Sequence, residues 1–131
     1  MKFQWRKLLA FAQTADAYVA QHPGETKAAY AIKRVRGQIT KYSEEIQTLM
    51  ADIEIDLCVV DDKEVIQRDS QGNLQFTREG FKERNKRQRA ILDEEFEIEP
   101  FYVDHLYDLT DEQLEIFEGL VLREEALQAT G

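Results

Sequence analysis

One long apolar stripe constrains this chain more than any other feature of its sequence. The stripe repeats at alternating spacings of three and four residues for three heptads, and it comprises Ile32, Val35, Ile39, Tyr42, Ile46, Leu49 and Ile53. These spacings place its members on one face of a helix and are typical of helices that pack along a seam. The stripe therefore predicts an amphipathic helix from Thr26 to about Ile53.

A second, shorter stripe precedes it. Apolar residues recur at helical spacing at Trp5, Leu8, Ala12, Ala15 and Val19. They predict a helix from about Phe3 to Ala20, which Pro23 and Gly24 then end, because proline cannot continue a helix and glycine lets the chain reverse. Two stripes joined by so short a turn must bury each other, so we expect an antiparallel helical hairpin over residues 1–53.

The period of the apolar pattern changes after the hairpin. Apolar residues alternate with polar or small ones, as in a strand, at Ile55, Leu57 and Val59. Further along, Asp69 and Ser70 come before Gly72, which is the order of residues in a tight turn between strands. The pattern predicts a small β-hairpin over residues 54–76.

Three further elements are expected in residues 77–131. A charged helix is predicted from Arg78 to about Glu95, and an alternating segment over 96–103 favours a short edge strand. A capping box formed by Thr110 and Gln113 marks the start of a short last helix. The fold class expected from all these elements is α+β, mainly α, in a single domain that contains all 131 residues.

The net charge of −9 is distributed unevenly along the chain. Residues 93–131 contain thirteen acidic residues and one basic residue, whereas residues 1–92 contain sixteen basic and thirteen acidic residues. Because phosphate repels an acidic protein, this balance argues against general binding to nucleic acid. It leaves open a local basic contact in the first part of the chain, or an acidic surface directed at a basic partner.

The residue types that usually carry catalysis are scattered. Cys58 lies inside an apolar pattern, which predicts a buried structural thiol, and the two histidines, His22 and His105, are isolated in turns. We therefore expect no catalytic residues, no metal or cofactor, no small-molecule ligand, and a protein that is not an enzyme. The single cysteine and the lack of a long apolar run predict a cytoplasmic protein that does not enter the membrane.

One run of positive charge stands out, and it comprises Lys82, Arg84, Lys86, Arg87 and Arg89. On a helix, Lys82, Lys86 and Arg89 share one face and are candidates for phosphate contact. The alternative is pairing within the chain, because Glu83 and Arg87 have the spacing of a favourable helical ion pair. A smaller basic cluster lies earlier in the chain, at Lys33, Arg34 and Arg36.

The long apolar stripe extends beyond the helix that is expected to cover it. Its last residues, Ile46, Leu49 and Ile53, lie past the end of the shorter first helix. An uncovered apolar stripe requires a partner. These three residues are therefore the predicted protein interface, and we expect a homo-oligomer.

Five short motifs follow one another between Leu8 and Leu122. They are Lys27-x-x-Tyr30-x-x-x-Arg34, Tyr42-Ser43-Glu44-Glu45, Gln71-Gly72-Asn73, Glu97-Ile98-Glu99-Pro100-Phe101 and Leu109-Thr110-x-x-Gln113-Leu114. Their order resembles a family of small proteins of unknown function that tailed bacteriophages and prophages encode. The resemblance implies a phage origin and a role beside virion or tail-assembly genes, in the bacterial host cell or in the virion. It carries over no catalytic residue.

These observations lead to three hypotheses. The first is a non-enzymatic phage virion component or assembly protein that acts through protein–protein contacts. The second is a nucleic-acid-binding module that uses the basic helix at 82–89. The third is an acidic mimic of nucleic acid, formed by residues 93–131, that blocks a host DNA-binding protein.

Overall fold

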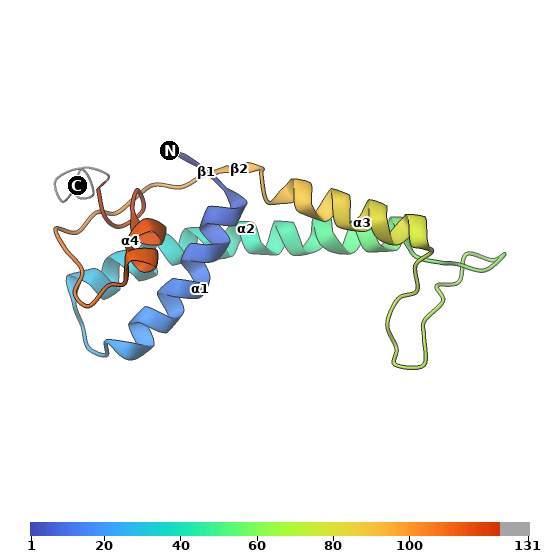
Figure 1. The fold of residues 1–131 in the computed structure, drawn as a ribbon, viewed down its shortest axis with the longest axis horizontal. Coiled ribbons are helices and arrows are strands. Elements are labelled where there is room, and N and C mark those ends of the chain that lie inside the picture. The colour runs from blue at the N-terminus through green and yellow to red at the C-terminus, as the bar shows by residue number, and fades with distance from the viewer. Residues whose placement is uncertain (124–131) are drawn as a thin grey trace. The chain divides into compact units, whose positions relative to one another are not determined.

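The computed structural model describes residues 1–123, and the expected class, α+β and mainly α, is confirmed (Figure 1). The elements in chain order are β1 (Lys2–Gln4), α1 (Trp5–Gln21), α2 (Lys27–Leu57), α3 (Arg78–Ile91), β2 (Glu95–Glu97) and α4 (Asp111–Phe117). They form two compact units. Unit 1 contains Met1–Tyr42 and the described residues from Glu94 onward, and unit 2 contains Ser43–Asp93, so α2 contributes to both.

The core of unit 1 is built where α1 crosses the first part of α2 (Figure 1). The buried stripe of α1 is Trp5, Leu8, Phe11, Ala12, Ala15 and Tyr18, and α2 buries Ala29, Ala31, Ile32, Val35 and Ile39. An ion pair between Arg36 and Asp16, 3.3 Å long, joins the two helices at the surface. Phe117 of α4 packs edge-on against Phe11, which closes the core from the C-terminal side. The expected helical hairpin is therefore present.

A two-stranded antiparallel sheet brings the two ends of unit 1 together. Phe3 of β1 lies opposite Phe96 of β2. The backbone N–H of Trp5 then donates to the carbonyl of Glu94, and α1 starts at this point. Residues 2–4 are thus a strand, although the apolar stripe predicted that the first helix starts at about Phe3. The strand expected over 96–103 is shorter and begins earlier, at Glu95–Glu97.

The prediction of a strand at Ile55, Leu57 and Val59 is wrong, because α2 continues through Leu57. The reason is that Leu57 stands four residues after Ile53, so the helical stripe continues at the same time as the alternating pattern begins. The turn at 69–73 is present, with Gly72 at φ +83° and two backbone N–H groups donating to the Asp69 carboxylate. The hairpin is reduced to isolated antiparallel bridges, Val60 with Ile66 and Arg68 with Leu74.

Three backbone hydrogen bonds close the loop between α2 and α3 into a ring. The N–H of Val59 donates to the carbonyl of Gln75, the N–H of Gln75 donates to Gln67, and the N–H of Gln67 donates back to Val59. Each residue of the ring therefore donates once and accepts once. Three chain segments spaced eight residues apart thus satisfy one another's backbone N–H and carbonyl groups without forming a regular sheet.

The remaining helix starts agree with the sequence. Thr77 caps α3 by accepting a hydrogen bond from the N–H of Gly80 at 2.9 Å. Thr110 and Gln113 form the expected capping box at the start of α4. α3 ends at Ile91 rather than at Glu95, because residue 95 pairs in the sheet.

Candidate functional site

Two aromatic rings and two ion pairs hold α3 against the second part of α2. The guanidinium of Arg84 lies 5.1 Å and 4.8 Å from the ring centroids of Phe76 and Phe81, and 3.8 Å from the Glu54 carboxylate. Arg87 reaches Asp56 of α2 at 2.7 Å, and its Nε donates to Glu83 on its own helix. The predicted pairing of Glu83 with Arg87 is therefore present. Two of the five charges in the basic run are used within unit 2.

The other three charges of the run are exposed. Lys82, Lys86 and Arg89 form no ion pair with any residue of the described chain, 1–123. They lie on one side of α3, and Arg78, also exposed, extends the row by one more turn. At about 1.5 Å per residue, the row from Arg78 to Arg89 is roughly 16 Å long. We call these four residues the basic stripe.

Exposed acidic residues occupy the second part of α2. Glu45, Leu49 and Asp52 share one face of this helix at spacings of four and three, and all three are exposed. Glu45 and Asp52 form no ion pair with the described residues. Glu44 adds a further exposed carboxylate on the adjacent face. We call Glu44, Glu45 and Asp52 the acidic stripe.

The three residues of the predicted protein interface have different environments. Ile46 is buried, with 5% of its surface exposed, Leu49 is 43% exposed, and Ile53 is half-buried. Ile46 therefore belongs to the small core of unit 2, and Leu49 is the member that is open at the surface. The choice of these three as an interface stays a prediction.

Unit 2 exposes more large apolar side chains than it buries. Its buried hydrophobic residues are Ile46, Cys58 and Ile91, and its exposed ones are Leu49, Ile55, Val60, Val65 and Phe81. Burial of apolar side chains provides most of the favourable free energy of folding. An exposed apolar surface of this kind is typical of a region of a protein that a binding partner covers.

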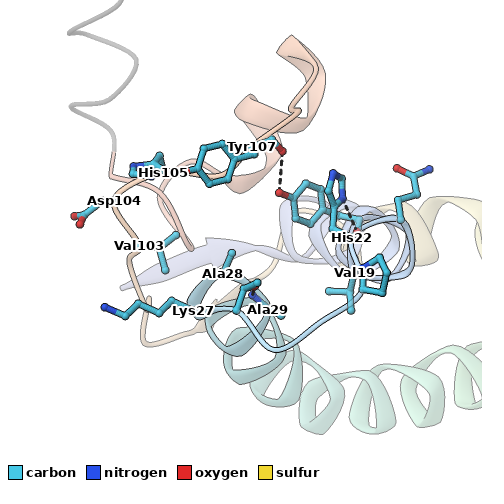
Figure 2. Close-up of a pocket in the computed structure, with 13 residues that line it drawn as sticks. Val19, His22, Lys27, Ala28, Ala29, Val103, Asp104, His105 and Tyr107 are labelled. Carbon is cyan, nitrogen blue, oxygen red and sulfur yellow. Dashed lines mark hydrogen bonds between the residues drawn. The ribbon is translucent and has the colours of Figure 1, made fainter.

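A pocket of about 640 Å³ in unit 1 brings both histidines together (Figure 2). It lies between the end of α1, the start of α2 and the segment before α4. Figure 2 shows Val19, Ala28, Ala29 and Val103 around an apolar interior, with His22 on one side and His105 and Tyr107 on the other. From the sequence alone, the two histidines are predicted to be isolated and no ligand is expected. No local signal could have found the pocket, because the two histidines are 83 positions apart in the chain.

The histidines are held by aromatic and hydrogen-bond contacts. His22 stacks on Tyr18 at 4.2 Å between ring centroids, and its Nδ1 donates to the Tyr18 carbonyl. Its Nε2 lies 3.6 Å from the carboxylate of Asp108, a residue with a left-handed backbone at φ +57°. The Nε2 atom of His105 lies 2.7 Å from the hydroxyl oxygen of Tyr107. Burial raises the pKa of Tyr18, whose hydroxyl donates to the Tyr107 carbonyl at 2.8 Å, so that hydroxyl stays protonated.

A second pocket of about 400 Å³ adjoins the first. Both pockets are lined by Lys27, Val103 and Asp104, and the second adds Tyr30, Phe101 and Tyr102. The ring of Tyr30 meets Phe101 edge-on at 5.5 Å, and the Arg34 guanidinium lies 5.3 Å from the centroid of Phe101. The guanidinium of Arg123 lies 5.5 Å from the centroid of Tyr102. We call the two joined pockets the aromatic groove.

The other candidate residues have structural partners. Cys58 is buried, and its thiol donates to the Ile55 carbonyl at 3.5 Å, as expected for a structural cysteine.

Residues 1–123 contain no group of three or more His, Cys, Asp or Glu side chains that could hold a metal ion. None of the helices in this range is long and apolar enough to cross a membrane. The acidic stretch 93–131 continues past the described residues, so the mimic hypothesis stays a prediction.

Comparison with known proteins finds no matching family model, no similar curated protein and no similar solved structure.

Proposed function

We propose that this protein is a non-enzymatic interaction protein that self-associates through unit 2. The observation that carries the proposal is the exposure of Leu49, Ile55 and Phe81 on a unit with so small a core. Apolar contact supplies most of the free energy of association between proteins. A partner that covers these side chains would enlarge the small core of unit 2.

Charge complementarity favours a second copy of the chain as that partner. The basic stripe of α3 and the acidic stripe of α2 are both exposed and both unpaired within residues 1–123. In a twofold dimer, the basic stripe of each copy faces the acidic stripe of the other, so the same contact occurs twice. Exposed ion pairs add little affinity, but they select the partner and the register. The apolar residues supply affinity, and the stripes supply specificity.

The resemblance to tailed-phage proteins makes virion or tail assembly the setting in which we expect this self-association to act. Assembly proteins need surfaces that join copies, and they need no catalytic site. The structural features that support this role are the exposed apolar residues and the two stripes of unit 2.

A charge-swap experiment tests the proposal. One variant carries Lys82→Glu with Lys86→Glu, and the other carries Glu45→Lys with Asp52→Lys. Each variant alone brings like charges together across both contacts, so we expect a monomer by sedimentation velocity at concentrations where the wild type is a dimer. Mixed in equal amounts, the two variants restore opposite charges at both contacts. The expected result is a one-to-one heterodimer.

A matched control carries Lys33→Glu with Lys41→Glu at exposed positions in the first part of α2. It changes the net charge by the same amount as Lys82→Glu with Lys86→Glu does. This control should self-associate as the wild type does. A wild type that stays monomeric up to about 100 µM, a concentration at which even weak interfaces with a Kd near 10 µM are occupied, would overturn the proposal. A mixture that stays monomeric would overturn the role of the stripes.

A second candidate function for the basic stripe is phosphate binding. It is favoured by the specific observation that Lys82, Lys86 and Arg89 are exposed and unpaired within residues 1–123. Contact with phosphates makes the logarithm of affinity fall linearly with the logarithm of salt concentration, with a slope of about −0.9 per phosphate on a duplex. A filter-binding titration of duplex DNA against salt therefore tests it. Loss of binding in Lys82→Glu with Lys86→Glu would support it, and no complex at low salt would exclude it.

A further inference from the structure

We propose that the aromatic groove of unit 1 binds single-stranded nucleic acid, with one base in each pocket and the intervening phosphate at Lys27. This inference concerns a different surface from the self-association through unit 2 and does not depend on it. The first observation is the pairing of the two pockets. They have volumes of about 640 and 400 Å³ and share the lining residues Lys27, Val103 and Asp104.

Each pocket offers aromatic faces. Tyr107 and Tyr30 are the most accessible of these rings, 68% and 57% exposed, and they belong to different pockets. Phe101 and Tyr102 line the second pocket beside Tyr30. Every nucleobase has a π-face, so rings placed in succession accept a strand of any sequence. Unit 1 therefore offers an exposed aromatic ring in each of two adjoining pockets.

Cations accompany these rings. Lys27 extends from the start of α2 away from His22, in the part of the groove that the two pockets share (Figure 2). Arg34 and Arg123 lie over Phe101 and Tyr102, where the planar guanidinium can stack and still donate hydrogen bonds to phosphate oxygens. Two carboxylates lie near these three cations, because Asp104 lines both pockets and Asp108 lies 3.6 Å from Nε2 of His22 at the first pocket.

The geometry selects a single strand over a duplex. Bases inside a duplex are stacked on one another and present only their edges in the grooves. Two concave pockets with aromatic walls require bases that are unstacked and turned outward. Two polar residues at the first pocket, Gln21 and His105, can then form hydrogen bonds with the edge of the base.

The test uses the full chain and fluorescence anisotropy of 5′-labelled dT12 and rU12, titrated at several salt concentrations. We expect binding that weakens with salt. Tyr30→Ala and Tyr107→Ala should each weaken it about 5- to 150-fold, the range reported by alanine substitution for one stacked base. Tyr30→Phe and Tyr107→Phe should retain binding, because phenylalanine keeps the ring. The exposure of both side chains lets all four variants fold, which circular dichroism checks.

Two charge variants locate the site. Lys27→Glu should abolish binding, whereas Lys41→Glu, an exposed change on the same helix and about 21 Å further along it, should leave binding unchanged. Lys82→Glu with Lys86→Glu should also leave it unchanged. Binding that survives both tyrosine-to-alanine changes but is lost in the α3 variant would overturn the groove as the site. Equal affinity for a matched duplex, or no anisotropy change at 50 mM salt, would overturn the inference as a whole.

Discussion

The hydroxyl of Tyr18, near the end of α1, donates a hydrogen bond to the backbone carbonyl of Tyr107 at 2.8 Å. This contact joins two segments that are 89 positions apart, and both tyrosines line the first pocket. Tyr18 also stacks with His22 and meets Phe117 edge-on at 5.6 Å. The residue therefore links the pocket to the core of unit 1.

Tyr18→Phe should destabilise unit 1 and relax the pocket. Removal of one partner of a partly buried hydrogen bond costs about 0.5–1.5 kcal/mol or somewhat more. The cause is that the Tyr107 carbonyl loses its donor while the ring packing is kept. Thermal unfolding followed by circular dichroism measures the cost. An unchanged midpoint would show that water replaces the hydroxyl without loss.

The same tyrosine should make stability depend on alkaline pH. Its pKa is raised above the ordinary value of 10.0, first because burial disfavours the phenolate and also because the Asp108 charge lies nearby. A raised folded-state pKa gives stability that is complete below pH 10 and is lost as pH rises through the folded value. Urea unfolding between pH 8 and 11 should therefore show a decline in the wild type that is smaller in Tyr18→Phe. Parallel declines in both proteins would assign the effect to other groups.

Ile46 and Leu49 should respond differently to alanine. Ile46→Ala removes a buried side chain from a small core and should cost about 2–5 kcal/mol of stability. Leu49→Ala removes a largely exposed side chain, so the stability of the isolated copy should change by about 0.5 kcal/mol or less, while self-association weakens. Denaturant unfolding at low concentration and sedimentation at high concentration separate the two effects. A large loss of monomer stability in Leu49→Ala would place that side chain in the core instead.

Two glycine-to-alanine changes should have different outcomes. Gly37 lies within α2 with nothing within 4 Å of the position of an added methyl group, so Gly37→Ala should stabilise by about 0.8–1 kcal/mol through helix propensity. At Gly80 the methyl group would lie 3.1 Å from the Leu57 carbonyl oxygen and from the Thr77 hydroxyl. Gly80→Ala should therefore gain less than Gly37→Ala or lose stability. Equal gains at both positions would show that α3 shifts away from the end of α2 without cost.

Removal of the cap on α4 should weaken the C-terminal side of unit 1. Thr110→Ala removes the side-chain oxygen that accepts from the N–H of Gln113, and such a change costs about 0.5–2 kcal/mol. Thr110→Ser keeps the acceptor and is the matched control. Hydrogen exchange of the amides in α4 measures the loss, which should appear in the alanine variant alone.

The features that could be predicted from sequence depend on residues that are close together in the chain. The capping box of Thr110 and Gln113 spans four residues, and the stripe that defines α2 repeats within each heptad. Ile55 and Leu57 were assigned wrongly because two periods overlap at that point, and the helix continued for one more turn. The helical spacing from Ile53 to Leu57 prevailed over the alternating pattern, and the sequence alone did not indicate which of the two periods would prevail.

The features that could not be predicted join distant parts of the chain. Phe3 and Phe96 pair across the sheet, and His22 and His105 meet at one pocket, although neither pair has a local signal. The basic run shows a mixed outcome. Its charge pattern identified the exposed Lys82, Lys86 and Arg89, but the use of Arg84 between two rings depended on Phe76, eight positions away.

The ring formed by Val59, Gln67 and Gln75 limits how the loop between α2 and α3 can vary. Side chains can be exchanged there freely, because every bond in the ring is made by the backbone. The length of the two segments between the ring residues, 60–66 and 68–74, which we call the arms, cannot be changed as freely. One residue added to an arm moves each later side chain of that arm to the opposite face and shifts two of the backbone hydrogen bonds of the ring at once. Insertions should be accepted only at the tips of the loop, beside Lys63 or Ser70. A foreign epitope placed at a tip should be displayed at the surface, whereas one residue deleted from an arm should open the ring.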